Sequence, residues 1–466
     1  MHRLMIIFSF LLFLVVSGAF HFCRPRAYLN TVLISIDTLR PDHLGCYGYS
    51  RETSPNIDRL AREGALFENA FSSTTWTLPA HMALLTSLPG LVHGVLNESF
   101  LLDERRITLA EVLKEHGYST YGIFTGPFLL PRWGFAQGFD DYLDATLYDK
   151  SLDGPEMLNA SERDRTTPGA IKNVESLLDQ NRKRPFFLFL HLFDAHPDFI
   201  PPPPYDTMFD PNYKGNIRGV DIMNNPEVNK DMEPEDLEHL RALYDGEICF
   251  VDEEGIGGLI RILKGRGILE KTLIVITSDH GEEFFEHGVF GHRQNLYDTT
   301  LRIPLIFWCP GRVSAGMVIK EQVRIIDIMP TILDLVGISQ SPEGVGRSLI
   351  PLLNGKEADR EERPIFAVLK DYKRYQEALR TEEYKVIRDY MKEERLFIDL
   401  IRDPEEVRPF MDPSLPEFQE AMNRFFSMRL NLTSFSKTLP WSNITAPELD
   451  PKLIERLKSL GYIKEK

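Results

Sequence analysis

The chain has 466 residues, 43% of them apolar, so it can bury a large core and is long enough for a main domain with a smaller one beside it. Its formal charge of −16 at pH 7 excludes the broad basic surface that a nucleic-acid-binding protein needs to neutralise phosphates. An anionic substrate would therefore need a local source of positive charge, and a bound metal ion is the obvious one.

Residues 1–20 have the pattern of an export signal. A basic start is followed by an apolar run over 4–16, and the small residues Ser17 and Ala19 have the spacing that a signal peptidase recognises. The run could instead remain as a short membrane anchor, and lipid attachment at Cys23 is a third alternative. We therefore expect an extracytoplasmic protein that is periplasmic, secreted or attached to a membrane through its N-terminus.

Apolar strands alternate with amphipathic helices over the first two thirds of the chain. Strands are expected at 31–36, 118–124, 186–193 and 272–278, and helices at 55–63, 80–88, 107–116, 169–181 and 235–264. Ser54 is expected to cap the first of these helices, which has Pro55 in its first turn and Gly64 at its end. This alternation predicts an α/β fold in which helices flank a mostly parallel central sheet.

The C-terminal part has a different pattern. Residues 339–362 are rich in glycine, proline, serine and charge, which indicates a linker or peripheral crossing. Beyond it, IFAVL, EYKVIRDY and ERLFIDL are short strand candidates that predict a small antiparallel α+β subdomain over 363–430. The tail, 431–466, is expected to consist of loops and one short helix at about 451–460.

Two of the expected strands end on acidic side chains. Asp37 follows the first strand, and Asp279 and His280 follow the strand at 272–278. Because the carboxyl ends of parallel strands meet at one edge of a sheet, these residues should converge although they lie far apart in the sequence. Each alone has an ordinary structural explanation, as a helix cap or a turn. Together they predict a metal site.

A hydroxyl-rich loop over residues 74–77 opens directly into a helix. Thr77 is expected at or near the helix N-terminus, where free backbone N–H groups and the helix dipole favour an oxyanion. Most threonines at such a position only cap the helix. The acidic strand ends expected nearby favour a chemical role for Thr77 instead.

These motifs resemble the sulfatase family, within the alkaline phosphatase superfamily. The resemblance lies in DTLRPDHLGCYGYSRETSPNIDRLAREGALFENAFSSTTWTLPAHMALLTSLPGLVHGV, HLFDAHPDF, YDGEICFVDEEGIGGLI, ITSDHGEEFFEHGVFGH, LYDTTLRIPLIF and EYKVIRDYMKEERLFIDLIRDPEE. It covers almost everything between residues 30 and 410. It implies an alkaline-phosphatase-like sulfatase fold with a catalytic domain at 28–338.

The resemblance implies a metal site made by Asp37, Thr77, Asp279 and His280. Thr38 stands in place of the second acid of the usual Asp-Asp pair, so one oxygen ligand is missing or weakened. His280 stands where sulfatases commonly have asparagine. Since a histidine favours a transition metal, one divalent ion is expected, with manganese or zinc favoured over calcium or magnesium.

Thr77 also stands where sulfatases have the Cys or Ser that becomes formylglycine. A threonine has no route to that aldehyde, so formylglycine is not expected, and Thr77 should act as a metal-held alkoxide. His81 replaces the arginine that supports the modified residue, and is expected to bind the substrate or orient a ligand. The family's Gly-Lys-Trp-His block has no counterpart, since residues 121–126 occupy that region.

His196 matches the family histidine that faces the ester group, and is expected to protonate the leaving oxygen or to bind the anion. His292 falls where many members have a lysine that contacts the anionic group. These two histidines could alternatively hold a second metal with Asp194. His191 is expected to be a core histidine. Structural or rim positions are expected for His43, His93 and His287.

The resemblance implies a hydrolase that cleaves sulfate or phosphate esters of a glycan, lipid or small molecule. Phosphoryl chemistry is at least as well supported, because a formylglycine hydrate expels sulfate with its second hydroxyl, whereas a Thr77 ester must be attacked at its central atom. A phosphoethanolamine-type transferase acting on an envelope glycan or lipid is one alternative, and a non-catalytic ligand-binding member is another.

Overall fold

The computed structural model describes residues 29–145, 166–180, 184–339, 344–355, 362–410, 412–440 and 444–449, together with 451, 453, 454 and 457. The expected export signal and Cys23 lie outside these residues. In the described part of the chain, no helix combines the length and the apolar character needed to cross a bilayer.

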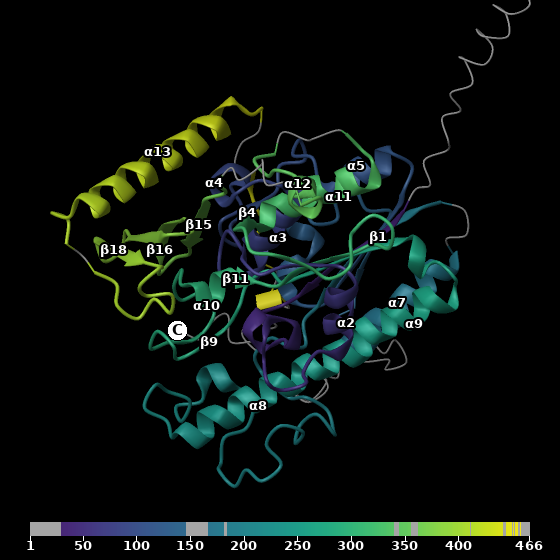
Figure 1. Ribbon diagram of the computed structural model, residues 1–466, viewed down its shortest axis with the longest axis horizontal. Helices are drawn as coiled ribbons and strands as arrows, with labels where there is room; N and C mark the ends of the chain where they lie inside the picture. The colour runs from purple at the N-terminus through teal and green to yellow at the C-terminus, as the bar shows by residue number, and fades with distance from the viewer. Residues whose placement is uncertain are drawn as a thin grey trace, which may run out of the picture.

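An eight-stranded sheet forms the centre of the molecule (Figure 1), with the strand order β13-β2-β12-β8-β1-β7-β5-β6. Its strands are β1 (Asn30–Ile36), β2 (Ala65–Phe67), β5 (Ser119–Phe124), β6 (Asp141–Asp144), β7 (Phe186–Leu192), β8 (Thr272–Thr277), β12 (Leu305–Trp308) and β13 (Met317–Ile319). Only β12 runs opposite to its neighbours. The predicted mostly parallel sheet is confirmed, and the four strands expected from the sequence are the adjacent strands β8, β1, β7 and β5.

Helices cover both faces of this sheet because alternate strand side chains point to opposite sides. Leu33 and Val275 join one hydrophobic cluster, and Ile34 and Ile276 join the other. The second cluster is covered by α2 (Pro55–Glu63), α7 (Thr167–Gln180), α8 (Pro234–Phe250) and α9 (Gly258–Gly265), and the first by α3 (Thr77–Thr86), α5 (Leu109–Glu115), α11 (Ile328–Val336) and α12 (Ile350–Leu353).

The long helix expected at 235–264 is continuous but contains a π-helical segment, Val251–Gly257, between α8 and α9. That segment carries Asp252, whose buried carboxylate accepts hydrogen bonds from the backbone N–H groups of Asn56 (2.9 Å) and Ile57 (2.8 Å). Asp252 therefore caps the N-terminus of α2. Ser54 stands at the N-cap position of α2 as expected, but its side chain does not bond to the helix N–H groups, because its hydroxyl donates to Asp58 at 3.0 Å.

A small antiparallel sheet lies to one side of the central sheet (Figure 1). It consists of β15 (Ile365–Lys370), β16 (Tyr375–Arg380), β17 (Tyr384–Asp389) and β18 (Glu394–Asp399). Helix α13 (Pro416–Thr438) packs on it through Phe418, Met422 and Phe425. The predicted antiparallel subdomain is confirmed, although β16 was not expected.

The end of α13 corrects the expected tail. Residues 431–438 are helical rather than loops, and Leu432 is buried against the small sheet. Further on, residues 451, 453, 454 and 457 are helical, and Leu453 and Leu457 are buried in the main core. The other residues of the expected terminal helix lie outside the described part. The proposed domain boundaries stay a prediction.

The remaining elements are short. They are β3 (Ala70–Phe71), β11 (Arg302–Ile303) and β14 (Val323–Arg324) in one sheet, the pair β9 (Glu283–Phe284) and β10 (Phe290–Gly291), the pair β4 (Phe100–Leu101) and β19 (Ile444–Thr445), and the helices α4 (Gly90–His93) and α10 (Asp298–Leu301). The β9–β10 hairpin matters for the site, because its register places the residues after Gly291 opposite those before Glu283.

The capping of α2 can be tested by substitution. Asp252→Ala should lower the free energy of unfolding by about 1–2 kcal/mol, because two N–H groups at the start of α2 lose their acceptor. Ser54→Ala should cost less, since its hydroxyl does not cap the helix. Chemical denaturation followed by circular dichroism measures both. A Ser54→Ala loss equal to or larger than the Asp252→Ala loss would show that the cap has been misassigned.

Candidate active site

Asp37 and Asp279 are fully buried at the carboxyl ends of the adjacent parallel strands β1 and β8. The register pairs Ser35 with Thr277, so both strands end at the same level. One Asp279 oxygen accepts hydrogen bonds from the backbone N–H groups of Thr38 (3.3 Å) and His280 (2.9 Å). Burial raises the pKa of Asp37, which means that its charged form is costly without a compensating cation.

Three acceptor atoms converge here. The ligand atoms of Asp37, Asp279 and His280 lie within 4.8 Å of one another. Asp37 Oδ1, Asp279 Oδ2 and His280 Nε2 are buried and have no hydrogen-bond partner. His280 Nδ1 donates to the carbonyl oxygen of Gly281 at 2.9 Å, so in the neutral ring Nε2 offers its lone pair to the cluster. Two carboxylates and an imidazole nitrogen are a donor set that fits a divalent cation.

Thr38 does not add a ligand to this set. Its hydroxyl donates to the carbonyl oxygen of Ala195 at 2.7 Å, and its own carbonyl accepts from the Tyr244 hydroxyl at 2.9 Å. The backbone of Thr38 has a positive φ of 54°, which turns the chain sharply after Asp37. Thr38 therefore joins the end of β1 to the loop after β7.

Thr77 is the first residue of α3, at the helix N-terminus as expected, and is 3% exposed. Its hydroxyl donates to Asp37 Oδ2 at 3.4 Å. The preceding Trp76 has extended backbone and provides no side-chain cap. The Arg293 guanidinium lies 4.0 Å from the centroid of the Trp76 ring and fixes it. A hydroxyl, an acid and a helix N-terminus thus meet at one point.

His81 lies one turn further along α3 and is fully buried. Its Nδ1 donates to the carbonyl oxygen of Thr77 at 2.9 Å, and its Nε2 accepts from the Ser35 hydroxyl at 2.9 Å. Burial lowers the pKa of His81 to about 3, so the ring is neutral. Both ring nitrogens are thus occupied within the protein, which gives His81 a part in holding Thr77. Contact between His81 and the substrate stays a prediction.

His191 is buried in β7, as expected for a core histidine, but it also contacts the candidate site. Its Nε2 lies 3.3 Å from Asp37 Oδ2, and its ring centroid is 5.0 Å from that of His81. Burial lowers the pKa of His191 to about 4. The sequence pattern marked only the apolar strand around His191 and gave no sign of its contact with Asp37.

His196 and His292 lie next to each other beside this cluster. Their ring centroids are 4.9 Å apart, and that of His292 is 4.6 Å from that of His280. His196 donates from Nδ1 to the carbonyl oxygen of Pro197 and stacks on Phe193 at 4.3 Å. Burial lowers the pKa of His196 well below its ordinary value and that of His292 to about 4.

Glu282 is a site residue that the sequence did not single out. Its Oε2 lies 2.8 Å from Nδ1 of His292, and its side chain is fully buried. Burial raises the pKa of Glu282 well above its ordinary value, so burial favours the uncharged form of both partners. The one available signal was its place directly after Asp279, His280 and Gly281.

The alternative of a second metal requires Asp194 to bind it together with the two histidines, but the Asp194 carboxylate is already engaged. Asp194 accepts hydrogen bonds at 2.8 Å from the backbone N–H groups of Thr166 and Thr167 and from the Thr166 hydroxyl. It is therefore occupied at the start of α7. Asp37, Asp279 and His280 are the one potential metal-binding group found in the described chain.

A cavity of about 570 Å³ opens beside the two histidines. His196 and His292 line it, whereas Thr77 and the three candidate ligands do not. The ring contact between His292 and His280 joins the cavity to the ligand cluster. A ligand in the cavity would therefore meet His196 and His292 on the side that leads to His280.

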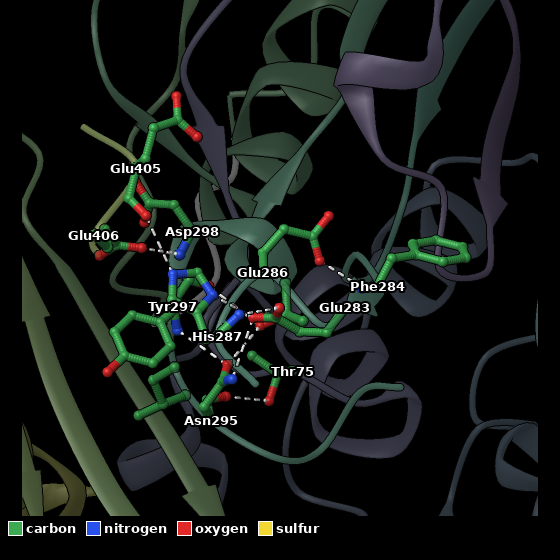
Figure 2. Close-up of polar contacts among 12 residues, drawn as sticks. Thr75, Glu283, Phe284, Glu286, His287, Asn295, Tyr297, Asp298, Glu405 and Glu406 are labelled. Carbon is green, nitrogen blue, oxygen red and sulfur yellow. Dashed lines mark hydrogen bonds and ion pairs between the residues drawn. The ribbon is translucent and has the colours of Figure 1, made fainter. Parts of the chain in front are cut away.

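Figure 2 shows polar contacts of Thr75, which lies in the loop before α3. The Thr75 hydroxyl donates to the carbonyl oxygen of Asn295 at 3.0 Å, and the Asn295 side chain donates to Glu283 at 3.2 Å. Glu283 also binds His287 at 2.7 Å, and His287 Nε2 lies 3.2 Å from the carbonyl oxygen of Glu405. His287, expected at a structural or rim position, thus connects the β9–β10 hairpin to the segment after β18.

Two family profiles match the chain. The family described as Sulfatase matches residues 29–338, and the one described as N-sulphoglucosamine sulphohydrolase, C-terminal, matches residues 285–430.

Curated proteins with similar sequences include an ulvan-active sulfatase of Formosa agariphila, 27% identical over 93% of this chain and 81% of that protein. Another is PehA of Trinickia caryophylli, described as a multifunctional alkaline phosphatase superfamily protein, with 26% identity over 71% of this chain and 78% of that protein. Among solved structures, the phosphonate monoester hydrolase of Agrobacterium radiobacter has the same fold, with a TM-score of 0.72, 23% identity, and coverage of 88% of this chain and 96% of that one. The expected alkaline-phosphatase-like sulfatase fold is thereby confirmed.

Metal binding by the three candidate ligands can be measured without any substrate. The protein loaded with manganese or zinc should retain one ion per chain in elemental analysis, and Asp279→Ala and His280→Ala should lose it. A metal concentration about a hundred times the dissociation constant should raise the free energy of unfolding by about 2.7 kcal/mol. A chelator should remove this gain. His116→Ala serves as the control histidine. Full occupancy in both ligand variants would place the metal elsewhere.

Proposed function

Because the chain belongs to the sulfatase family, we propose that it is a metal-dependent hydrolase that cleaves sulfate or phosphate esters with Thr77 as its nucleophile. The observation that carries this proposal is the Thr77 hydroxyl, which lies at the N-terminus of α3 and 3.4 Å from Asp37. A protein that only binds its ligand has no need of a hydroxyl beside a metal-binding group. The geometry therefore favours turnover over binding alone.

The first step is attack by Thr77. A divalent ion bound by Asp37, Asp279 and His280 would lower the pKa of the adjacent hydroxyl. Thr77 directs its proton towards Asp37, and the N-terminus of α3 stabilises the developing oxyanion. The Thr77 oxygen then bonds to the sulfur or phosphorus as the bond to the leaving oxygen breaks. His81 keeps the start of α3 in place through the Thr77 carbonyl.

The second step releases the ester group from Thr77. Water attacks the central atom of the Thr77 ester and regenerates the hydroxyl. His196 and His292, whose pKa values are depressed by burial in the absence of an anion, gain affinity for a proton when an anionic ester lies beside them. In the first step, His196 protonates the leaving oxygen while Asp37 takes the Thr77 proton. His292, held by Glu282, binds the anionic group. In the second step, the attacking water gives a proton to His196, and Asp37 returns its proton to the Thr77 oxygen.

The relatives support both ester classes. By their printed descriptions, one is a sulfatase active on ulvan and another a multifunctional member of the alkaline phosphatase superfamily. We propose an anionic ester of a glycan, lipid or small molecule as the substrate. On the export pattern of residues 1–20, we further propose that the protein acts outside the cytoplasm.

The nucleophile is tested with matched aryl sulfate, phosphate monoester and phosphodiester substrates. Thr77→Ala should lower kcat/KM by at least about a thousandfold on the preferred ester, because the covalent route is lost. Thr77→Ser should retain measurable activity, and Thr74→Ala, a change in the same loop, should leave it unchanged. Mass spectrometry of the quenched wild-type enzyme should find the adduct on Thr77. If the enzyme prefers the aryl sulfate and the Thr77→Ala variant is still active, Thr77 is not the nucleophile and phosphate esters are not the preferred substrates.

The role of His196 depends on the leaving group. His196→Gln should lower kcat/KM by about a hundredfold for an unactivated phenyl ester, because the departing oxygen then lacks its proton donor. With a 4-nitrophenyl ester, which leaves readily without a proton, the loss should be several-fold smaller. His116→Ala should change neither rate. Equal losses on both esters would assign His196 to anion binding instead of proton transfer.

A further inference from the structure

The cavity beside His196 and His292 is built from three segments that are far apart in the sequence. These are the loop after β7, the β9–β10 hairpin with the residues that follow it, and the turn between β15 and β16. Its volume of about 570 Å³ is within the usual range of small-molecule sites. Because His196, the proposed proton donor to the leaving oxygen, lines this space, the part of the substrate that leaves after cleavage would occupy it.

One wall of the cavity is apolar. It is formed by Ile222, Met223, Val228, Phe285, Val289 and Phe290. The rings of Phe285 and Phe290 have centroids 5.5 Å apart, and Ile222 is fixed by its N–H group, which donates to Asp198 at 2.7 Å. Met223 packs on the backbone of Gly291, where a Cβ would lie 3.1 Å from its terminal methyl group. This wall fits an apolar body better than a bare sugar ring.

The other side of the cavity is basic. Lys230, Arg293, Lys373 and Arg374 line it, with Asp371 as the one acidic lining residue in the described chain. The whole chain, by contrast, has a formal charge of −16. Positive charge is therefore concentrated where a ligand would lie, which is what an anionic ligand requires in an acidic protein.

The turn between β15 and β16 is shaped to present two of these cations. Asp371 accepts hydrogen bonds from the backbone N–H groups of Lys373 (2.6 Å) and Arg374 (2.8 Å), which closes the turn. Its other oxygen binds Arg293 Nε at 3.2 Å and Arg374 Nη1 at 3.3 Å. The carboxylate of Asp371 thus orders the turn and is shared between two guanidinium groups.

Lys373 differs from the other three cations. Arg293 is also paired with Glu98, and Lys230 with Asp231 at 2.6 Å. The Lys373 ammonium lies 5.3 Å from the centroid of the exposed Tyr372 ring and pairs with no carboxylate in the part of the chain that the structure describes. Its charge is therefore available to a ligand without first breaking an ion pair.

We propose that the ester substrate has an apolar leaving group that carries a second negative charge, and that Lys373 and Arg374 bind this charge while the apolar wall contacts the body. The second anion is a carboxylate, sulfate or phosphate, which share this chemistry. The inference rests on the proposed function, since it names the leaving-group side of the same site. The turn between β15 and β16 then determines specificity without touching the reacting atoms.

The subsite is tested by calorimetric titration of the full-length, metal-loaded protein with non-hydrolysable sulfonates. The probes are methanesulfonate, benzenesulfonate, meta-benzenedisulfonate and biphenyl disulfonate. Wild-type protein should bind at least one disulfonate about tenfold more tightly than benzenesulfonate, and benzenesulfonate more tightly than methanesulfonate. The preference for disulfonate should disappear in Lys373→Ala/Arg374→Ala and persist in Lys370→Ala, a basic residue of β15 that does not line the cavity.

A kinetic measurement separates this inference from the proposed function. With aryl esters that differ only by a ring carboxylate, the double variant should raise KM about tenfold for the carboxylated ester alone and leave kcat unchanged. If no ester is turned over but the disulfonate preference exists, the proposed function fails and the subsite stands. Equal affinity of the wild type for mono- and disulfonates, absence of sulfonate binding, or an unchanged preference in the double variant would overturn the subsite.

Discussion

Two carboxylates, Asp37 and Asp279, are buried side by side where β1 and β8 end, and mutual repulsion and loss of hydration both oppose their charge. Two backbone N–H groups donate to one Asp279 oxygen and offset part of this unfavourable free energy. Asp37 Oδ1 and Asp279 Oδ2 have no donor and face His280 Nε2. A cation is the partner that relieves all three atoms at once. The neighbouring strands and Thr77 at the start of α3 are placed around this group, so the geometry of the site follows from the order β8-β1-β7.

The backbone sets the orientation of the histidines in this site. His81, His196 and His280 each bind a main-chain carbonyl through Nδ1, those of Thr77, Pro197 and Gly281. Because a carbonyl only accepts, Nδ1 keeps its proton in the neutral ring and Nε2 is left as an acceptor. His191 approaches Asp37 through Nε2 instead, and His292 differs from His81, His196 and His280 because its Nδ1 meets the Glu282 carboxyl group. A side-chain partner can exchange a proton with the ring, whereas a carbonyl cannot, and this distinguishes His292 chemically from the other three.

The acidic strand ends and the position of Thr77 could be predicted from the sequence, because long buried strands and a helix start have clear periodic and capping patterns. The pair of Glu282 and His292 could not, since it depends on the β9–β10 hairpin, whose two-residue strands are too short for a periodic signal. The same limit explains why Asp252 was missed as a cap, because a π-helical segment has no such pattern. The last turns of α13 were missed because mostly polar residues surround Leu432, and their helix is stabilised by packing on the small sheet.

The balance of charge at the reacting centre bears on which ester fits. Two carboxylates match the charge of one divalent cation, and neither Asp37 nor Asp279 forms an ion pair with lysine or arginine in the described parts of the chain. Burial keeps His81 and His191 neutral by depressing the pKa of each ring. The positive charge that His196 and His292 can gain is therefore the main compensation for an incoming anion. Such a centre balances one negative charge more readily than two, which favours sulfate monoesters and phosphodiesters over phosphate monoester dianions. The lysine and arginine side chains line the same cavity as His196 and His292, where the proposed leaving group would lie.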